Sequence, residues 1–201
     1  MKNLSALALG LSVLLGSYAY AQTNTEQEPE TLVLSDSLSY DDNAKTTQFR
    51  GNVILTRGLF RLTSDNLDIT EDADGFRHGK ASMNSSELVE LIEEDLANYE
   101  VIRAFGLSAE YNGKSEVVTM IGQAVVTRYV CGQPVDNVRG EKVVYDSKNK
   151  TYAALGGPQS PEPGRVRSLV QPRSKADRAV EECRKKYNGK PMPSSIQTPN
   201  I

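Results

Sequence analysis

One stretch of sequence occurs twice, and this repeat constrains the fold more than any other feature of the chain. The first copy is Tyr40–Arg57 and the second is Tyr111–Arg128. A shift of 71 positions aligns the two copies without a gap and places Gly51 on Gly122. Self-similarity at a fixed spacing indicates one supersecondary unit used twice to build a continuous core. Chance similarity between two hairpins is the alternative explanation.

Each copy has the pattern of a β-strand that bends at a glycine. An extended stretch leads into turn residues, at 41–43 and at 112–114, and a β-rich run interrupted by Gly51 or Gly122 follows. A glycine inside a strand pattern marks a bulge or a bend. Two bends at equivalent places predict a sheet that curves twice in the same sense.

Further short strands surround the repeat. Alternating or β-rich stretches run from Leu32 to Tyr40, Leu59 to Leu62, Leu67 to Ile69 and Gly140 to Tyr145. Turn residues separate these stretches at roughly ten-residue spacing, which is typical of an all-β sandwich, barrel or roll. The stretch from Asn84 to Asn98 departs from this pattern, because its apolar residues recur at helical spacing between acids. It predicts a short acidic helix or a loose hairpin inserted between the repeats.

The N-terminus has the pattern of an export signal. Residues 1–21 combine one lysine, an apolar run from Leu4 to Leu15 and the small-residue site Ala19-Tyr20-Ala21. The apolar run is too short for a stable membrane anchor, so we predict a cleaved signal peptide; an uncleaved anchor is the alternative. Residues 22–30 are polar and predict a flexible leader. Export places the mature protein in an oxidising compartment.

The C-terminal part predicts a last strand, a helix and a tail. Residues 165–171 alternate like a strand at the edge of a sheet, which completes one β domain over 31–171. Residues 172–201 predict a helix followed by a disordered, proline-rich tail. The helix has apolar residues on one face, and Ser174 with Asp177 supplies its start signal.

The two cysteines predict one disulfide bond. Cys131 and Cys183 are the chain's cysteines, and two cysteines in an exported chain most simply pair. The bond closes a loop of about 50 residues, worth on the order of 4 kcal/mol in the loop-entropy model. It pins the C-terminal helix against the turn after the second repeat. A metal pair or a redox couple is less favoured, because neither cysteine has a neighbouring Cys or His.

Charge and motifs argue against several classes of function. The chain has 23 basic and 26 acidic residues, unlike the strongly basic domains that bind nucleic acids. It contains no Gly-x-Ser-x-Gly, Walker loop, histidine cluster or Cys-x-x-Cys, so we expect no enzyme activity, cofactor or metal. The acidic stretch Glu71–Gly75 reads as a solvated turn rather than a calcium loop, and His78 as a surface residue. A carboxylate-dependent hydrolase using Asp36 and Asp65 is kept as a hypothesis.

Strand alternation predicts an apolar interior. Phe49, Val53, Leu55, Met120 and Val126 fall on the inward face of their strands. Apolar interiors between curved sheets can hold acyl chains, and methionine adapts to flexible ligands. The alternative is that these side chains simply pack against one another.

The order of several motifs carries a family resemblance. The motifs are Ser35-Asp36, Gly51-Asn52-Val53-Ile54-Leu55-Thr56, Ser64-Asp65, Gly79-Lys80-Ala81, Tyr111, Gly122-Gln123-Ala124 and Gly140-Glu141-Lys142-Val143-Val144-Tyr145. In this order and spacing, and with a signal peptide before them, they make the chain resemble the OstA-like (LptA) family of periplasmic lipopolysaccharide-transport proteins. The resemblance covers residues 31–169.

The resemblance implies a fold, a ligand and partners. It implies a curved antiparallel β-jellyroll, open at both ends, with an apolar groove for the lipid A acyl chains of lipopolysaccharide or lipooligosaccharide. It also implies non-enzymatic units that join head to tail in the periplasm. Such units bridge an inner-membrane LptC-like component and an outer-membrane LptD-like component. A structural β-assembly module without a lipid ligand is the alternative function.

Residue by residue, the resemblance and the alternation together define candidate sites. Thr31, Val33, Met83 and Tyr111 match groove positions of the family and join the five interior residues as candidate acyl-chain contacts. The joining edges are expected in the first and last strands, because unpaired backbone groups there accept another chain's strand. The candidate edge residues are Leu32, Leu34, Val166, Leu169 and Val170.

This sequence departs from the family pattern in three places. The stretch 84–98 is long and acidic, Met83 stands where an aromatic residue is expected, and the cysteines and C-terminal helix are additions. The helix is expected to interfere with head-to-tail joining if it covers the last edge strand.

Overall fold

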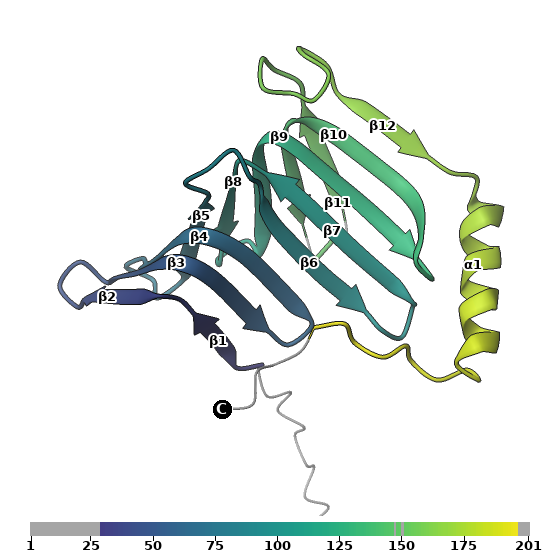
Figure 1. Ribbon diagram of the computed structural model, residues 1–201, viewed down its shortest axis with the longest axis horizontal. Helices are drawn as coiled ribbons and strands as arrows, with labels where there is room; N and C mark the ends of the chain where they lie inside the picture. Colours follow the sequence, from purple (N-terminus) through teal and green to yellow (C-terminus); the bar gives the residue numbers. More distant parts are fainter. Residues whose placement is uncertain (1–28, 147, 150, 197–201) are drawn as a thin grey trace, which may run out of the picture.

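A computed structural model describes residues 29–146, 148–149 and 151–196, which form twelve strands and one helix (Figure 1). The expected signal peptide (1–21) and most of the expected leader (22–30) lie outside the described residues. The elements are β1 (Thr31–Leu34), β2 (Ser37–Asp41), β3 (Thr46–Arg57), β4 (Phe60–Glu71), β5 (Arg77–Ser82), β6 (Val89–Asp95), β7 (Glu100–Gly106), β8 (Ser108–Asn112), β9 (Val117–Val130), β10 (Gln133–Asp146), β11 (Thr151–Leu155), β12 (Arg167–Val170) and α1 (Arg173–Lys186).

The strands form one antiparallel sheet whose four long strands each belong to two layers. The N-terminal halves of β3 and β9 pair with β2 and β8, and their C-terminal halves pair with β1 and β7. The long strands β4 and β10 divide in the same way, between β5 and β6 and between β11 and β12. We call the part with β2, β5, β8 and β11 the first layer, and the part with β1, β6, β7 and β12 the second layer. The predicted curved β-jellyroll is confirmed.

The bends between the layers fall at the two glycines of the repeat. Gly51 and Asn52 have φ values of +77° and +46°, and Gly122 and Gln123 have +71° and +51°. Both β3·β4 and β9·β10 shift register at this point, as β-bulges do. The two bends predicted from the sequence are therefore confirmed.

Space as well as backbone geometry requires glycine at the bends. A Cβ atom on Gly51 would lie 2.2 Å from Oδ2 of Asp36, and one on Gly122 would lie 2.7 Å from Cδ1 of Leu107. Asp36 and Leu107 are themselves 71 positions apart. Their backbone N–H groups donate to the Gly51 and Gly122 carbonyls at 3.0 and 2.9 Å. The two copies of the repeat thus share an equivalent backbone hydrogen bond at the bend, which argues against chance similarity.

The repeat unit is a set of six strands. β1–β6 correspond to β7–β12, and β8 lies 71 positions after β2 at both its ends. The two units are joined where β5 pairs with β8 and β6 pairs with β7, an arrangement that we call the internal junction.

The stretch from Asn84 to Asn98 forms no helix, so that alternative was wrong. Residues 89–95 form β6, which makes an ordered hairpin with β7 and pairs with β4 on its other side. Val89 and Leu91 belong to the interior cluster, whereas Glu90 between them and Ile92 after them do not, as expected for a strand with a period of two residues. The apolar spacing fits helix and strand alike, and the free edge of β4 selects the strand.

Helix α1 is held against the turn between β9 and β10. Cys131 and Cys183 form the predicted disulfide, with Cα atoms 5.6 Å apart. Ala179 and Cys183 are buried on the helix side, and Val130 and Val135 on the sheet side. The helix begins after Pro172 without a side-chain cap, so the start signal predicted at Ser174 is not used. No helix within the described residues is both long and apolar enough to span a membrane.

The tail after α1 is attached to the sheet as far as the structure describes it, so the prediction of disorder was wrong for these residues. Tyr99 donates its hydroxyl to the Lys190 carbonyl at 3.0 Å, and the Met192 N–H donates to Leu96 at 3.1 Å. Ile196 is buried. Proline-rich composition removes secondary structure from a segment but does not prevent it from docking as an irregular chain.

Candidate functional site

An apolar interior lies between the two layers and runs through both repeat units. Its buried residues come from β3, β4, β5 and β6 in the first unit and from β7 to β10 in the second. Val53 and Val143 have no exposed area, and Met120 is 2% exposed. The interior is therefore closely packed along its middle.

The structure brings eight of the nine candidate acyl-chain contacts together. Phe49, Val53, Met120 and Val126 belong to the buried cluster, and Val33, Leu55, Met83 and Tyr111 pack against it. Thr31 differs, because it is exposed at the start of β1, opposite Arg57. Their role in ligand binding stays a prediction.

The interior opens into a cavity at the end that the second repeat unit forms. The cavity measures about 210 Å³ and lies between the layers. Its lining residues are Val126, Arg128, Asp136, Val138, Tyr152 and Val170. Only Val126 and Val170 were among the predicted sites. Ligand pockets for drug-sized molecules span roughly 300–1,000 Å³, so the cavity has room for only part of a long acyl chain.

A cluster of charged side chains borders this cavity. Arg128 Nη1 lies 2.7 Å from Glu100, and its Nη2 lies 2.6 Å from Asp136. Burial opposes the charge of the guanidinium, but the hydrogen bonds and negative charges of these partners outweigh it and raise the pKa of Arg128. The pairs hold the ends of β7, β9 and β10 together. Sequence alternation alone gave no signal for this cluster, because it depends on which strands become neighbours.

Two tyrosines of the first layer lie beside the same cavity. Tyr145 and Tyr152 stack with ring centroids 4.8 Å apart. Burial raises the pKa of both hydroxyls, that of Tyr152 to about 12, and the negative charge of Glu93 adds to the shift. Tyr145 belongs to the first layer and is hydrogen-bonded to Glu93 of the second. Polar contacts therefore cross the interior near the second unit's end.

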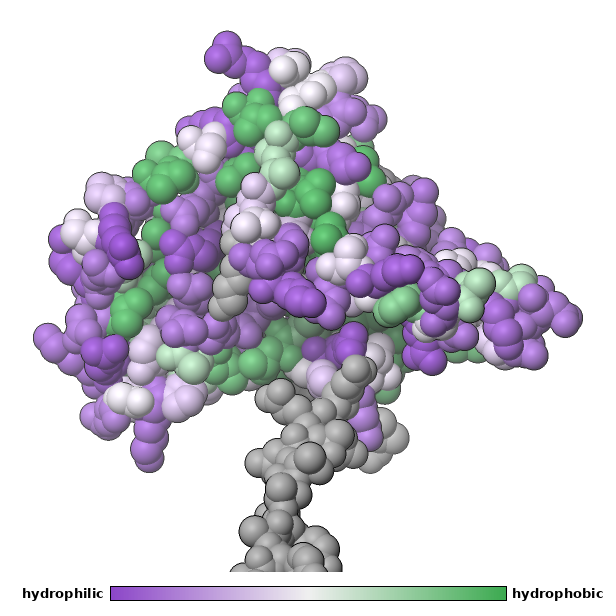
Figure 2. Space-filling view, turned by 180° about the vertical axis from the view of Figure 1, so that it is seen from behind, coloured by the Kyte–Doolittle hydropathy of each residue, from purple (hydrophilic) through white to green (hydrophobic). Residues whose placement is uncertain are grey.

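Both edges of the sheet expose apolar side chains. Most of the exposed large hydrophobic residues lie in β1 and β2 at one edge or in β11, β12 and the residue before β12 at the other. They are Leu34, Leu38 and Tyr40 at the first edge, and Tyr152, Leu155, Val166, Leu169 and Val170 at the second. Figure 2 shows hydrophobic side chains among polar ones on the upper rear face, where Figure 1 draws β10 to β12.

The candidate edge residues occupy these free strands. Leu32 and Leu34 are in β1, Leu169 and Val170 are in β12, and Val166 precedes β12 by one residue. Val170 is 72% exposed. Helix α1 packs on the turn after β9 instead of over β12 (Figure 1). The helix therefore does not cover the last edge strand, which was the condition for its interference with head-to-tail joining.

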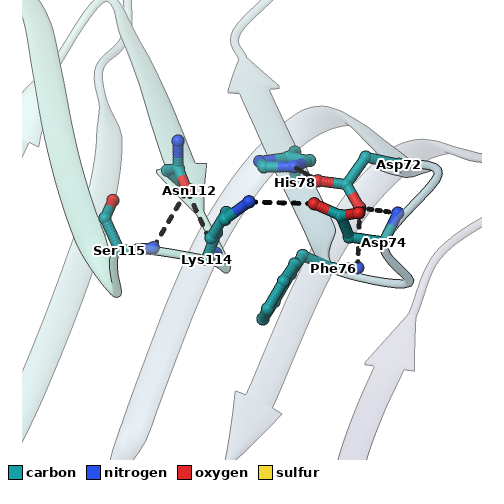
Figure 3. Close-up of polar contacts among 7 residues, drawn as sticks. All are labelled: Asp72, Asp74, Phe76, His78, Asn112, Lys114 and Ser115. Carbon is teal, nitrogen blue, oxygen red and sulfur yellow. Dashed lines mark hydrogen bonds and ion pairs between the residues drawn. The ribbon is translucent and has the colours of Figure 1, made fainter.

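The acidic turn between β4 and β5 is a local polar network (Figure 3). One carboxylate oxygen of Asp72 accepts the backbone N–H groups of Asp74 and Phe76, and the other lies 2.9 Å from Nε2 of His78. The hydrogen bond with His78 is the main reason that the pKa of Asp72 is lowered. Asp74 forms an ion pair with Lys114 of the turn between β8 and β9, at 2.8 Å. The carboxylates are used internally, and across the described residues no cluster of three or more metal-ligating side chains is present.

The two candidate hydrolase carboxylates also have local partners. Asp36 accepts a hydrogen bond from the Asn52 side chain at 2.9 Å, beside the bend at Gly51. Asp65 accepts the backbone N–H of Asn84 at 2.7 Å. Both carboxylates stabilise the chain near the bends, and this arrangement gives no support to a catalytic pair.

These features define a class of protein: an open-ended, two-layer antiparallel β-jellyroll with an apolar interior and unpaired edge strands. The chain belongs to the family described as LptA/(LptD N-terminal domain) LPS transport protein, whose sequence profile matches residues 32–151.

Individual relatives agree with this assignment. The lipopolysaccharide export system protein LptH of Pseudomonas aeruginosa is 29% identical over 178 residues, which cover 87% of this chain and 97% of LptH. The LptA protein of Escherichia coli K12 is 26% identical over 151 residues, covering 74% of this chain and 77% of LptA. The crystal structure of P. aeruginosa LptH superposes with a TM-score of 0.61 at 26% identity, covering 72% of this chain and 96% of that one.

Proposed function

We propose that this protein is a non-enzymatic periplasmic carrier that binds the lipid A part of lipopolysaccharide or lipooligosaccharide. In this proposal it joins head to tail with further copies and bridges an inner-membrane LptC-like component to an outer-membrane LptD-like component. The observation that carries the proposal is an apolar interior that extends between two unpaired, apolar sheet edges. Membership of a lipopolysaccharide-transport family supports the choice of ligand.

The internal junction serves as a template for the joint between copies. Within the chain, Thr56 pairs with Arg61, Arg61 with Ile92 of β6, and Ile92 with Arg103 of β7. This row crosses from the first repeat unit to the second through ordinary antiparallel pairing. It shows which backbone positions of a last strand meet those of the next unit's first strand.

The corresponding row of paired residues in the second repeat unit ends at β12. Thr127, which lies 71 positions after Thr56, pairs with Asn137, and Asn137 pairs with Leu169 of β12. The next member, equivalent to Arg103, is Leu32 in β1 of another copy. The template therefore predicts that Leu169 of one copy lies opposite Leu32 of the next.

Disulfide trapping tests this register. A chain with Leu169→Cys and Leu32→Cys is expected to form covalently linked oligomers under mild oxidation, seen as a ladder of bands on a gel. The reason is that residues directly opposite each other in paired β-strands have adjacent side chains. The control is Leu169→Cys with Val33→Cys, since neighbouring residues of a strand point to opposite faces. Ladders from the control but not from the predicted pair would exclude this register. Ladders from neither would contradict head-to-tail joining through these edges.

The family description supports the outer partner. The same family includes the N-terminal domain of LptD. A partner that presents the same fold offers the same kind of edge strand, so the β11–β12 edge is expected to accept it by strand addition. The β1–β2 edge then faces the LptC-like component.

Photo-crosslinking in living cells tests the ligand. A photoreactive residue at Val33, Met83 or Tyr111 is expected to form covalent adducts with lipid A, because all three side chains pack against the interior cluster. The control position is Lys45, which lies in an exposed turn. Adducts from Lys45 alone, or from none of the positions, would contradict lipid transport through the interior.

One observation favours the alternative of an assembly module without a ligand. Val53, Met120 and Val143 are almost fully buried by the protein's own side chains. Binding of an acyl chain then requires the two layers to separate around it. Titration with lipid A distinguishes the two functions, because a carrier gives saturable binding and a purely structural module gives none.

A further inference from the structure

The C-terminal segment runs along one side of the molecule that the function above leaves unexplained. The turns at 58–59, 96–99 and 131–132 lie on the same side of the second layer, because Phe60 pairs with Glu93 and Glu100 pairs with Val130. We call these three turns the rim. Figure 1 shows α1 and the tail following the rim from the end of β9 toward the end of β3.

Each turn of the rim has an attachment to the segment or lies next to one. Cys131 holds α1 through the disulfide bond. Tyr99 stacks on Tyr187 with ring centroids 6.1 Å apart and binds the Lys190 carbonyl. Near the first turn, the buried carboxylate of Glu94 accepts hydrogen bonds from Ser194 and Ser195, and the Glu94 N–H donates to the Leu59 carbonyl. The segment is therefore fixed on the rim along its length.

The attached segment carries a charge opposite to that of the rest of the chain. Residues 173–196 contain seven basic and three acidic side chains, a net charge of +4. Because the whole chain carries −3, the other residues together carry −7. The basic side chains of the segment are Arg173, Lys175, Arg178, Arg184, Lys185, Lys186 and Lys190.

Most of these cations are not neutralised locally. Arg184 pairs with Glu181 at 2.7 Å, and Glu182 accepts a hydrogen bond from Gln133. Among the residues that the structure describes, Lys175, Arg178 and Lys185 have no carboxylate within ion-pair distance. Attachment to the rim does not account for this charge, because the attachments use the disulfide, Tyr99 and Glu94.

The opposite side of the molecule differs in this respect. The turns of the first layer also carry cations, two of which have an acidic partner there. Lys45 pairs with Asp42 at 2.8 Å, and Lys114 pairs with Asp74 at 2.8 Å. Exposed pairs of this kind leave little net field. Among the described residues, the segment on the rim thus carries more unneutralised positive charge than the turns of the first layer.

We infer that α1 and the tail form a cationic rail that contacts the phosphorylated saccharide of the glycolipid whose acyl chains occupy the interior. This inference rests on the proposed function. An acyl chain between the layers leaves its polar head at an opening of the sheet, and the rim borders the second layer where the long strands turn. A positive rim attracts phosphate groups and raises their local concentration. The protein's remaining −7 would otherwise repel such an anionic ligand.

Neutralising the rail tests the inference in the full mature chain with its disulfide intact. The rail variant carries Lys175→Gln, Arg178→Gln, Lys185→Gln and Lys190→Gln. The control variant carries Lys45→Gln, Arg77→Gln, Lys80→Gln and Lys114→Gln on the other side, with the same change in net charge. Binding is measured for bisphosphorylated lipid A and for the same lipid with its phosphates removed, at two salt concentrations.

The rail variant is expected to bind phosphorylated lipid A about tenfold more weakly than the wild type, equivalent to about 1.4 kcal/mol. Its binding of the dephosphorylated lipid is expected to equal that of the wild type. The control variant is expected to lose much less, and high salt is expected to reduce the difference between the variants.

The outcomes separate this inference from the proposed function. If the wild type binds both lipids and the two variants behave alike, the rail is not a headgroup contact, although the carrier function stands. If the wild type binds neither lipid, the carrier function itself fails. If the wild type, but not the rail variant, binds phosphatidylglycerol vesicles that contain no glycolipid, the rail is a membrane-docking surface and the inference is overturned.

Discussion

Replacing both cysteines by serine is expected to release the C-terminal segment while leaving the sheet folded. The disulfide joins residues 52 positions apart, and the loop-entropy model assigns such a loop about 4 kcal/mol. That full value applies only if α1 stays docked without the bond. If α1 detaches instead, the C-terminal segment gains in the native state the same conformational freedom that it gains in the unfolded chain. The free energy of unfolding then falls only by the free energy of docking α1.

The structure favours detachment. An isolated helix of 14 residues is marginal in water, and the side chains that α1 buries most deeply are the small Ala179 and Cys183. Burying side chains of this size contributes only about 1–2 kcal/mol each. This is too little to order the helix, since fixing each backbone residue costs roughly 1–2 kcal/mol. The docked state of α1 therefore depends on the covalent bond.

Hydrogen exchange followed by mass spectrometry distinguishes the two cases. In the double-serine chain, amides of 173–186 are expected to lose their protection, while those of β9 and β10 keep theirs. The midpoint of denaturant unfolding is expected to shift by less than a 4 kcal/mol loss would produce. Protection of α1 equal to that of the sheet, together with a loss near 4 kcal/mol, would refute this reasoning.

Three further predictions concern the bend, the tail and the interior. Gly122→Ala is expected to destabilise the fold by about 2–4 kcal/mol in urea unfolding, because the position combines a positive φ with a close contact between the new Cβ atom and Leu107. Gly132→Ala is the control: its φ is also positive, but a Cβ atom there has no neighbour within 4 Å, so the expected cost is only about 1 kcal/mol. Burial opposes the charge of Glu94, but hydrogen bonds from the tail serines lower its pKa. Its contribution to tail docking is therefore present at neutral pH and is lost as the pH falls through that lowered pKa. Hydrogen-exchange protection of residues 190–196 is expected to decrease in acid in the wild type and to be insensitive to pH in Glu94→Gln. Val53→Asp is expected to lose roughly 3 kcal/mol or more of stability in thermal unfolding, because it buries an unpaired charge where no area is exposed, and a folded, fully stable variant would show that the interior opens readily.

Much of the fold could be predicted because the repeat and the glycine pattern are local features of sequence. Gly51 and Gly122 mark bends that depend on their own backbone angles, and the motifs around them identify the family. The disulfide was predicted from the small number of cysteines and the predicted export signal. The stretch 84–98 was ambiguous for a physical reason, because its strand exists only through pairing with β4 and β7.

The candidate site was predicted less completely than the fold. Alternation within one strand identifies an inward side chain such as Val126, and it succeeds wherever the layer is regular. It does not reveal which charged residues meet across strands, and therefore the contacts of Arg128 with Glu100 and Asp136 were missed. The attachment of the tail at Glu94 was missed for the same reason, since about 100 residues separate the partners.

The repeat itself explains why both edges remain open. Each unit ends in strands that pair with the first strands of the following unit, so a chain of two units leaves one first set and one last set unpaired. Soluble proteins usually protect such edges with charges, prolines or a covering element. Here Val170 and Leu38 are well exposed instead, and α1, which follows β12 in the chain, is fixed by Cys131 to the rim. The helix next to this edge is thus held away from it, an arrangement that agrees with the proposed pairing of the edge by another chain.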